Sequence, residues 1–327
     1  MKKILIILCL FLPGNAIGQN HNLISQYFQV MPFYAPGLTG ANDFLDIRTG
    51  IRKQWTDIDG APISYFIGGA GILKIGPHNP NKYNSVRVGN DSPYHMKTTK
   101  FGVGGYIFDE RIGAARQTGA MVSTAVHVMI TNSAYLSLGV TTGYHNTRIN
   151  PTKLRVLNPD NDDLYQELLN NGESESYFKL NTGIAVYSES FYLSYALLNA
   201  ADPHISGNPN LSSNSSEMLH TIVGGYRIST GQNLEVIPAS YIRFSQTTPL
   251  LFDVGARFRY NQNFYMGMSY RNDQTLIALF GMTLDNTYSL GYSFERKQID
   301  FSSFNPLSHE IVIGVKLFDS KNYTSLW

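Results

Sequence analysis

Two short stretches of this 327-residue chain carry groups that do chemistry in other proteins. Ser308-His309-Glu310 combines a hydroxyl, an imidazole and a carboxylate. No nucleophile elbow and no ordered triad partner accompany them, so we expect no catalysis and predict a loop-to-strand junction with Glu310 facing the interior. Gly102-x-Gly104-Gly105 resembles a nucleotide-binding loop, but no helical pattern follows it. A glycine-rich strand without a cofactor is therefore predicted.

The run from Asn158 to Asp163 is the candidate for a cation site. Its oxygen-rich side chains, above all Asp160, Asp162 and Asp163, are of the kind that calcium prefers. The run lacks the glycine and the closing glutamate of an EF-hand loop, and the alternative is a solvated loop. The 8 histidines are scattered without paired spacing, so no other metal site is predicted.

The stretch from Trp55 to Pro62 holds two carboxylates, Asp57 and Asp59, followed by Gly-Ala-Pro. Its turn chemistry indicates a constrained first hairpin. A second interpretation is a contact surface for a substrate or partner protein. Trp55, Asp57 and Asp59, together with the Ser308-His309-Glu310 stretch, are the candidate partner-contact residues.

The first residues have the layout of a signal peptide. Met1-Lys2-Lys3 is positively charged, Ile4 to Leu12 is apolar but too short to span a bilayer, and small residues precede a cleavage site after Gly18. The mature chain would begin at Gln19. Cleavage would remove Cys9, the only cysteine, so no disulfide or thiol chemistry is expected.

Composition separates this chain from ordinary soluble proteins. Charged residues make up 15%, against about 25% in typical domains, while the chain has 21 Tyr, 18 Phe and 29 Gly. No later stretch of about 18 apolar residues exists, which excludes spanning helices. The formal net charge is +1 before cleavage, so nothing indicates nucleic-acid binding. Strands that face lipid on one side and water on the other fit this composition.

Strict alternation of apolar and polar residues supports that interpretation. From Phe252 to Tyr260, every second residue is apolar and the residues between them are Asp, Gly or Arg. Similar alternation appears at 45–52, 264–271, 288–295 and 310–317. The polar faces would place charged side chains in a lumen, where mixed signs favour a plug over an open pore: Asp46, Arg48, Arg52, Asp253, Arg257, Arg259, Arg271, Glu310 and Lys316.

Connection lengths distinguish a barrel from a secreted sandwich, since both alternate. Tight turns at 131–133, 188–190, 231, 261–263 and 285–286 occupy every second connection, whereas 150–176, 199–215 and 295–309 are long. Short turns on one side and long loops on the other are typical of outer-membrane barrels, with the long loops extracellular. One connection departs from this rule, the long, proline-containing 76–97 insertion on the turn side.

The predicted fold is therefore an all-β transmembrane antiparallel barrel of about fourteen strands with a partly plugged lumen. The predicted divisions are a signal peptide (1–18), an N-terminal periplasmic or plug segment (19–42), the barrel (43–318) and a C-terminal tail (319–327). Strands are expected to begin near Asp43, Ile63, Thr98, Thr118, Ala134, Tyr177, Phe191, Ser216, Leu234, Leu250, Phe264, Leu276, Thr287 and Glu310.

The order of local motifs resembles the PorP/SprF family of type IX secretion system outer-membrane proteins of the Bacteroidetes, over essentially the whole mature chain. The most specific element is R-x-Q-W-x-x-I-x-G-A-P, from Arg52 to Pro62. The other matching segments, in order, are Ser25-Gln26-Tyr27, Tyr34, Pro36 and Gly40, Gly102-Val103-Gly104-Gly105 through Ile112-Gly113, Gly225-Tyr226-Arg227, Pro238-Ala239-Ser240, Gly267-x-Ser269-Tyr270-Arg271, Gly291-Tyr292-Ser293 and Ser308-His309-Glu310-Ile311.

The chain departs from the family at its opening, where Val30 or Met31 and Ala35 replace asparagines. The resemblance implies a non-enzymatic barrel that lies in outer-membrane lipid and works with other type IX components. Such a barrel would export or hold at the surface a large adhesin-type protein, through that protein or its C-terminal domain, and in gliding bacteria it would support motility. The alternatives are a diffusion channel or hydrophobic-substrate transporter, and an outer-membrane enzyme, for which no constellation is found.

Overall fold

The structure is a computed structural model. It describes residues 23–73, 99–171, 173–206, 217–231, 233–298 and 306–318. The expected signal peptide and its cleavage site, the 76–97 insertion and the C-terminal tail lie outside these ranges. Within them, no helix is both long enough and apolar enough to cross a membrane.

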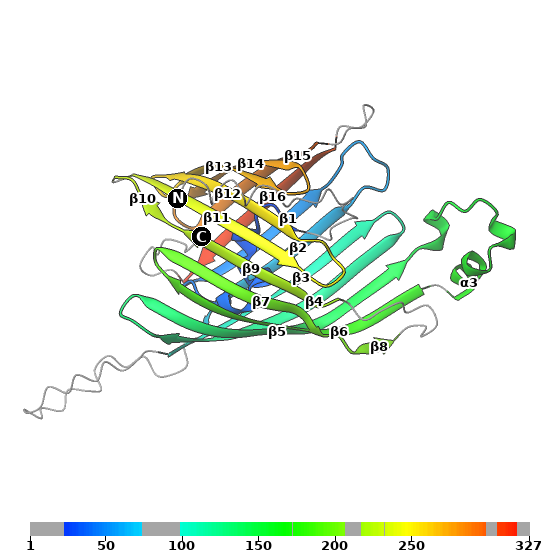
Figure 1. Ribbon diagram of the computed structural model, residues 1–327, viewed down its shortest axis with the longest axis horizontal. Helices are drawn as coiled ribbons and strands as arrows, with labels where there is room; N and C mark the ends of the chain where they lie inside the picture. The colour runs from blue at the N-terminus through cyan, green and yellow to red at the C-terminus, as the bar shows by residue number, and fades with distance from the viewer. Residues whose placement is uncertain are drawn as a thin grey trace, which may run out of the picture.

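Fourteen antiparallel strands form the wall of a barrel, and two short strands pair at its margins (Figure 1). β8 (His204–Ser206) pairs with β6, and β10 (Ile228–Ser229) pairs with β11. The wall strands are β1 (Leu45–Lys53), β2 (Ile63–Leu73), β3 (Thr99–Ile112), β4 (Ala115–Met129), β5 (Ala134–Ile149), β6 (Glu173–Ser188), β7 (Phe191–Ala201), β9 (Leu219–Tyr226), β11 (Leu234–Phe244), β12 (Leu251–Tyr260), β13 (Phe264–Arg271), β14 (Thr275–Leu284), β15 (Tyr288–Lys297) and β16 (Leu307–Leu317).

Pairing between the first and last strands closes the sheet. β1 pairs with β16 over nine residue pairs, from Leu45 opposite Leu317 to Lys53 opposite His309. Each remaining wall strand pairs with the wall strands before and after it, including β9 with β11. Closure removes the sheet edges, which would otherwise expose unpaired backbone groups to hydrocarbon. The predicted fold class is confirmed.

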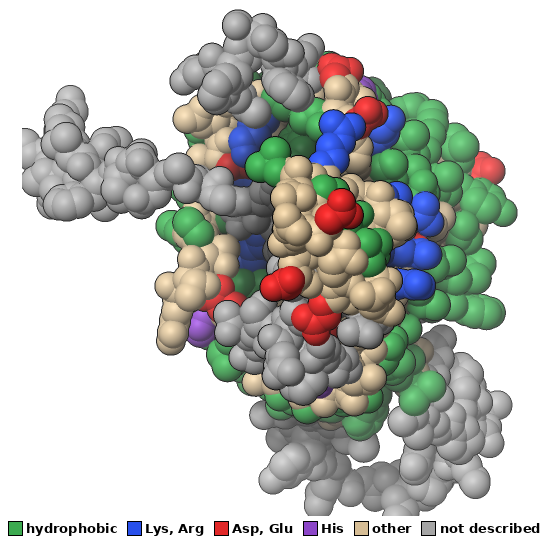
Figure 2. Space-filling view, turned by 90° about the vertical axis from the view of Figure 1, so that its right-hand side faces the viewer, with side chains coloured by type: hydrophobic (Ala, Val, Ile, Leu, Met, Phe, Trp, Pro, Cys, Tyr) green, Lys and Arg blue, Asp and Glu red, His purple; other side chains and the backbone are tan. Residues whose placement is uncertain are grey.

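The two faces of the wall differ as the alternation predicts. On β13, Phe264, Met266 and Met268 are exposed, whereas Arg271 is 5% exposed. The charged residues predicted for the lumen are buried, except Lys316, which is half-buried with its ammonium over the Phe44 ring. The outer surface is correspondingly hydrophobic (Figure 2). Apolar side chains outward and charges inward are the pattern of a membrane barrel.

The tight turns lie together at one end, called the turn end, and the opposite end is called the loop end (Figure 1). In the β14–β15 turn, Asp285 and Asn286 both have positive φ, as the two central residues of a type I′ turn do, and Thr287 N–H donates to Leu284 O at 3.0 Å. The loop end carries the 150–172 connection, with η3 (Pro151–Lys153), η4 (Pro159–Asn161) and α3 (Asp163–Asn171). It also has short connections, Gly113-Ala114 and 272–274.

Several expected strand starts are displaced. β6 begins at Glu173 rather than near Tyr177, and β4 and β16 each begin three residues earlier than expected. β9 begins three residues later, at Leu219. The early starts extend the strands into polar sequence at the loop end, where backbone pairing needs no apolar face. α3, β8 and β10 were not predicted.

A charge placed on the outer face of β4 tests the membrane span. Val122 is 67% exposed at the strand centre, and Val128 lies near the turn end on the same face. We expect Val122→Arg to lower the free energy of unfolding by ~2–4 kcal/mol, because Arg is costly at the bilayer midplane. Val128→Arg is the matched control and should cost no more than ~1 kcal/mol. Guanidinium unfolding in lipid vesicles measures both, and equal costs would contradict the assignment.

Candidate functional site

The segment that precedes β1 occupies the interior of the barrel. η1 (Tyr27–Val30), α2 (Met31–Tyr34) and η2 (Pro36–Leu38) lie within the ring of strands (Figure 1). We call residues 23–44 the plug. Its short helices pair their own backbone groups, as in Ala35 N–H to Met31 O at 2.9 Å. Met31 and Leu38 are fully buried, so the plug supplies the apolar core that a lumen of charged side chains lacks.

Glu310 of β16 holds the start of the plug. Its carboxylate accepts hydrogen bonds from the backbone N–H groups of Ser25 (2.8 Å) and Gln26 (2.9 Å). The guanidinium of Arg52 lies 3.6 Å from the same carboxylate. Hydrogen bonds to a charged acceptor are about twice as strong as neutral ones. One lumen carboxylate therefore ties the plug to the seam between the first and last strands.

A chain of buried ion pairs extends from this anchor across the lumen. Arg52 donates to both carboxylate oxygens of Glu295, at 2.9 and 3.0 Å. Arg271 lies 3.8 Å from Glu295 and 3.3 Å from Asp253. All are at most 5% exposed. Because each buried charge has an opposite neighbour, the network offsets the large desolvation cost of placing charges in the barrel.

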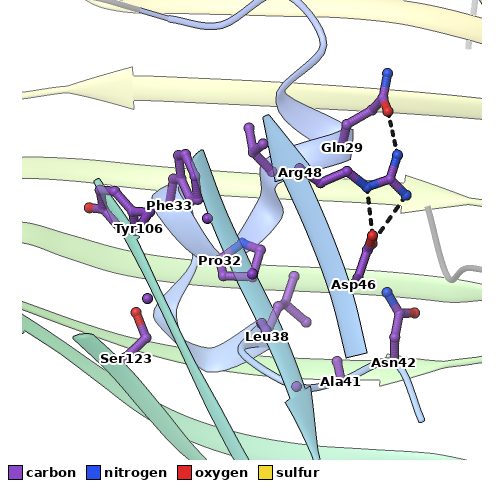
Figure 3. Close-up of a pocket in the computed structure, with 16 residues that line it drawn as sticks. Gln29, Pro32, Phe33, Leu38, Ala41, Asn42, Asp46, Arg48, Tyr106 and Ser123 are labelled. Carbon is purple, nitrogen blue, oxygen red and sulfur yellow. Dashed lines mark hydrogen bonds and ion pairs between the residues drawn. The ribbon is translucent and has the colours of Figure 1, made fainter. Parts of the chain in front are cut away.

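A second polar cluster joins the middle of the plug to β1 (Figure 3). Arg48 donates to Asp46 at 2.6 Å and to the side-chain carbonyl of Gln29 at 2.6 Å. Gln29 in turn donates to the Tyr265 hydroxyl at 2.9 Å. A small cavity of about 30 Å³ lies beside this cluster. The plug and the wall are thus packed closely together at this level.

Aromatic contacts complete the packing of the plug. Phe33 stacks on Tyr106 with ring centroids 4.0 Å apart, and the Arg257 guanidinium lies 3.6 Å above the Phe28 ring. The hydroxyl of Tyr34 accepts a hydrogen bond from Ile24 N–H at 3.0 Å. Burial raises the pKa of the Tyr34 phenol, so it stays neutral in the lumen.

Glycines in the wall allow the plug backbone to approach closely. A Cβ atom on Gly139 would lie 2.1 Å from the carbonyl oxygen of Pro36, and one on Gly102 would lie 1.9 Å from that of Thr39. Wall side chains beside these glycines also contact the plug backbone. The Ser137 hydroxyl, for example, donates to Gly37 O at 2.5 Å. The Gly102 stretch is therefore a glycine-rich strand, as predicted, and its glycines are contact points for the plug.

Above the plug, the lumen widens at the loop end into a cavity of about 490 Å³, which we call the vestibule. Ile24, Phe33 and Tyr34 of the plug contribute to its lining. Its wall combines apolar side chains such as Phe66 and Phe108 with polar side chains of mixed charge, which include Arg52, Glu110, Gln117, His145, Lys179, Asn181, Asn199, Glu217 and Arg243. The vestibule can accept a chain segment that offers both apolar and polar groups, and the plug lies directly below it.

Glu217 is a fixed negative charge of the vestibule wall. Desolvation alone would raise its pKa, but hydrogen bonds from Thr247 and Thr248 lower the pKa to about 2. The Thr248 hydroxyl donates at 2.8 Å, and the Thr247 backbone N–H also donates. This carboxylate therefore stays ionised throughout the pH range in which cells live.

Ser308, His309 and Glu310 do not converge. Ser308 and Glu310 point into the lumen, where the Ser308 hydroxyl lies 3.4 Å from Trp55 N–H. His309 points outward, with Nδ1 2.7 Å from the Tyr292 hydroxyl and its ring against Phe294. Neighbours in a strand face opposite sides of the sheet, so the three residues do not form a catalytic unit.

The hairpin loop that carries Trp55, Asp57 and Asp59 lies at the loop end between β1 and β2. Asp57 and Asp59 are exposed, and Trp55 is half-buried with a φ of 44°. Backbone bonds hold the loop against its neighbours, from Thr56 N–H to Leu307 O and from Gly113 N–H to Gly60 O. The loop is therefore constrained, and its two carboxylates remain available to a partner.

Asp160, Asp162 and Asp163 lie beside the start of α3. The Asp162 side chain accepts from Tyr165 N–H at 2.9 Å, as a helix N-cap does. Throughout the part of the chain that the structure describes, no three His, Cys, Asp or Glu side chains are grouped to hold a metal ion. In the structure, the Asp162 side chain is engaged in helix capping.

Sequence reasoning missed the plug contacts made by Gln26, Gln29 and Tyr265. The signal was partly present, since Ser25-Gln26-Tyr27 belongs to the family's opening motif and Tyr265 falls on the lumen side of the β13 alternation. Its hydroxyl donates to Gln26 at 3.0 Å. No local pattern predicts which lumen side chains meet an irregular segment.

A closed barrel with an apolar exterior and charged interior defines an outer-membrane protein. The chain belongs to the PorP/SprF family of type IX secretion system membrane proteins, whose sequence profile matches residues 16–315. Among curated proteins, none matches.

Solved structures with a similar outline are outer-membrane proteins of low identity. The toluene transporter TbuX of Ralstonia pickettii shares 10% identity, with 87% of this chain and 92% of that one covered and a TM-score of 0.47. The outer membrane protein Omp33 of Acinetobacter baumannii shares 8%, covering 85% and 99%, with a TM-score of 0.45. The toluene transporter TodX of Pseudomonas putida shares 9%, covering 89% and 93%, with a TM-score of 0.43.

Filling the space at Gly139 should displace the plug. Because an added side chain would collide with the Pro36 carbonyl, we expect Gly139→Val to raise conductance in planar bilayers and to cost about 1–3 kcal/mol through overpacking. Gly224→Ala is the control, since a Cβ there meets its nearest atom, on Leu193, at 3.4 Å. Unchanged conductance with a folded Gly139→Val barrel would argue against plug displacement.

Neutralising Glu310 should release the start of the plug. Glu310→Gln removes the charge that pairs with Arg52 and holds Ser25 and Gln26. We expect it to lower the free energy of unfolding by about 3–5 kcal/mol. A Ser25→Cys reporter measures release, because Ser25 is 1% exposed and the mature chain is expected to contain no other cysteine. Maleimide labelling should be slow in the parent and fast with Glu310→Gln. His309→Gln, which alters the outward neighbour, should leave it slow.

Proposed function

We propose that this barrel is a non-enzymatic component of type IX secretion that supports the export or surface attachment of one large adhesin-type protein. The observation that carries the proposal is a filled lumen beneath a vestibule. The plug packs against the lumen wall and leaves a cavity of about 30 Å³ beside its polar cluster, whereas the cavity of about 490 Å³ at the loop end accommodates part of a partner. Family membership supplies the secretion system.

In this proposal the loop end is extracellular and the turn end periplasmic, as the positions of the tight turns favour. The signal peptide is cleaved after Gly18. The exported protein, or its C-terminal domain, contacts the vestibule wall and the neighbouring hairpin loop. Trp55 supplies apolar area, and the carboxylates of Asp57, Asp59 and Glu217 supply negative charge. Other type IX components bind the barrel, and in a gliding organism the exported adhesin serves motility.

Deletion of the gene tests this function. We expect one specific surface protein to disappear from the surface proteome while uptake of small solutes stays unchanged, because the plugged lumen contributes no general permeability. Reintroducing the wild-type chain should restore the protein, and a chain with Trp55→Ala, Asp57→Asn and Asp59→Asn should restore it less well. An intact surface proteome, or a loss of solute uptake, would favour a channel or transporter instead.

A further inference from the structure

Outside the lumen, four cations stand in one row across the outer face of the wall. Residues directly opposite in an antiparallel sheet share a face. The register places Lys53 opposite Ile63, Ile63 opposite Arg111, Arg111 opposite Arg116, and Arg116 opposite Arg148. The row crosses β1 to β5, about 19 Å at about 4.8 Å per strand. All four charged side chains are exposed.

This arrangement is unfavourable without an anion. Like charges directly opposite each other destabilise a sheet, and here two successive pairs are Arg against Arg. Asp109 contributes one carboxylate, 3.4 Å from Arg111 and in a closer ion pair with Arg116. Arg111 and Arg116 nonetheless remain 56% and 52% exposed. Among the ion pairs of the described residues, these four cations face one carboxylate, which leaves a surplus of three positive charges in the row.

The surface below the row is apolar. Two rows toward the membrane centre, Ile67 is opposite Ile107, and on the far side of β4 Tyr144 is opposite Phe178. Their exposed fractions lie between 45% and 59%. In Figure 2, Lys and Arg side chains line the edge of the hydrophobic outer surface. A cationic row above an apolar belt matches a molecule with a phosphorylated head and acyl chains.

We propose that Arg111, Arg116 and Arg148, flanked by Lys53, bind the phosphate groups of a phosphorylated glycolipid of the outer leaflet. The guanidinium fork suits phosphate, since it can donate two parallel hydrogen bonds. The acyl chains then lie on the belt of Ile67, Ile107, Tyr144 and Phe178. This rests on the proposed orientation, in which the loop end is extracellular. The bound lipid neutralises the row and fixes the depth of β3 to β5 in the membrane.

Native mass spectrometry of the purified full chain in mild detergent tests the proposal, with phosphorylated lipid A as the probe. We expect the triple variant Arg111→Gln, Arg116→Gln and Arg148→Gln to reduce bound lipid A at least about tenfold, given the contribution of each cation near a lipid surface. The single variant Arg116→Gln should give a smaller loss and serves if the triple variant does not fold. The matched control is Arg296→Gln, an exposed arginine of β15 whose register neighbours are Leu276 and Leu307.

Two further probes distinguish a lipid from a free anion. Dephosphorylated lipid A should bind wild type only as weakly as lipid A binds the triple variant, and inorganic phosphate at equal concentration should not displace lipid A. Equal binding by wild type and a folded triple variant, equal loss with Arg296→Gln, or displacement by inorganic phosphate would overturn the proposal. The measurement needs no exported partner, so its outcome is independent of the surface-proteome test.

Discussion

The structure depends on closure of the sheet between β1 and β16. In hydrocarbon no water is available to pair a backbone N–H or C=O, so a strand wall is stable there only when its last edge meets its first. Closure also sets the register that places Arg52 opposite Glu310. Those two side chains point inward, and Glu310 then accepts the first backbone groups of the plug. The packing of the plug in the lumen therefore depends on the pairing of β1 with β16.

A lumen filled by charges needs two kinds of compensation, and the chain provides both. Opposite charges pair along the lumen from Arg52 through Glu295 and Arg271 to Asp253. Between and beside them, the plug inserts Met31, Leu38 and its aromatic rings as an apolar core. The plug, an irregular N-terminal segment, thus forms much of the apolar core of this protein, and the strands of the wall surround it. That division explains a barrel that is closed at one level and open as a vestibule at another.

The wall could be predicted from the sequence because the side-chain period of a strand is two and the membrane imposes one apolar face. The alternation in segments such as 251–260 therefore predicts that they form strands and which of their faces points toward lipid. The early start of β6 could not be predicted, since at the loop end neither face must be apolar. The fold of the plug could not be predicted either, because it depends on distant side chains such as Tyr265, which contacts Gln26 and Gln29, and His127, whose Nε2 lies 2.9 Å from Thr39 O. Ser308, His309 and Glu310 are adjacent in sequence, but within β16 His309 faces outward while Ser308 and Glu310 face the lumen.

The anchor between the plug and Glu310 joins the two extremes of the described chain. Ser25 and Gln26 precede the first wall strand, and β16 is the last wall strand of the described chain. The hydrogen bonds that hold the start of the plug therefore form only when both ends of the described chain are in place. A plug that is bound to Glu310 therefore indicates a barrel into which β16 has already been incorporated.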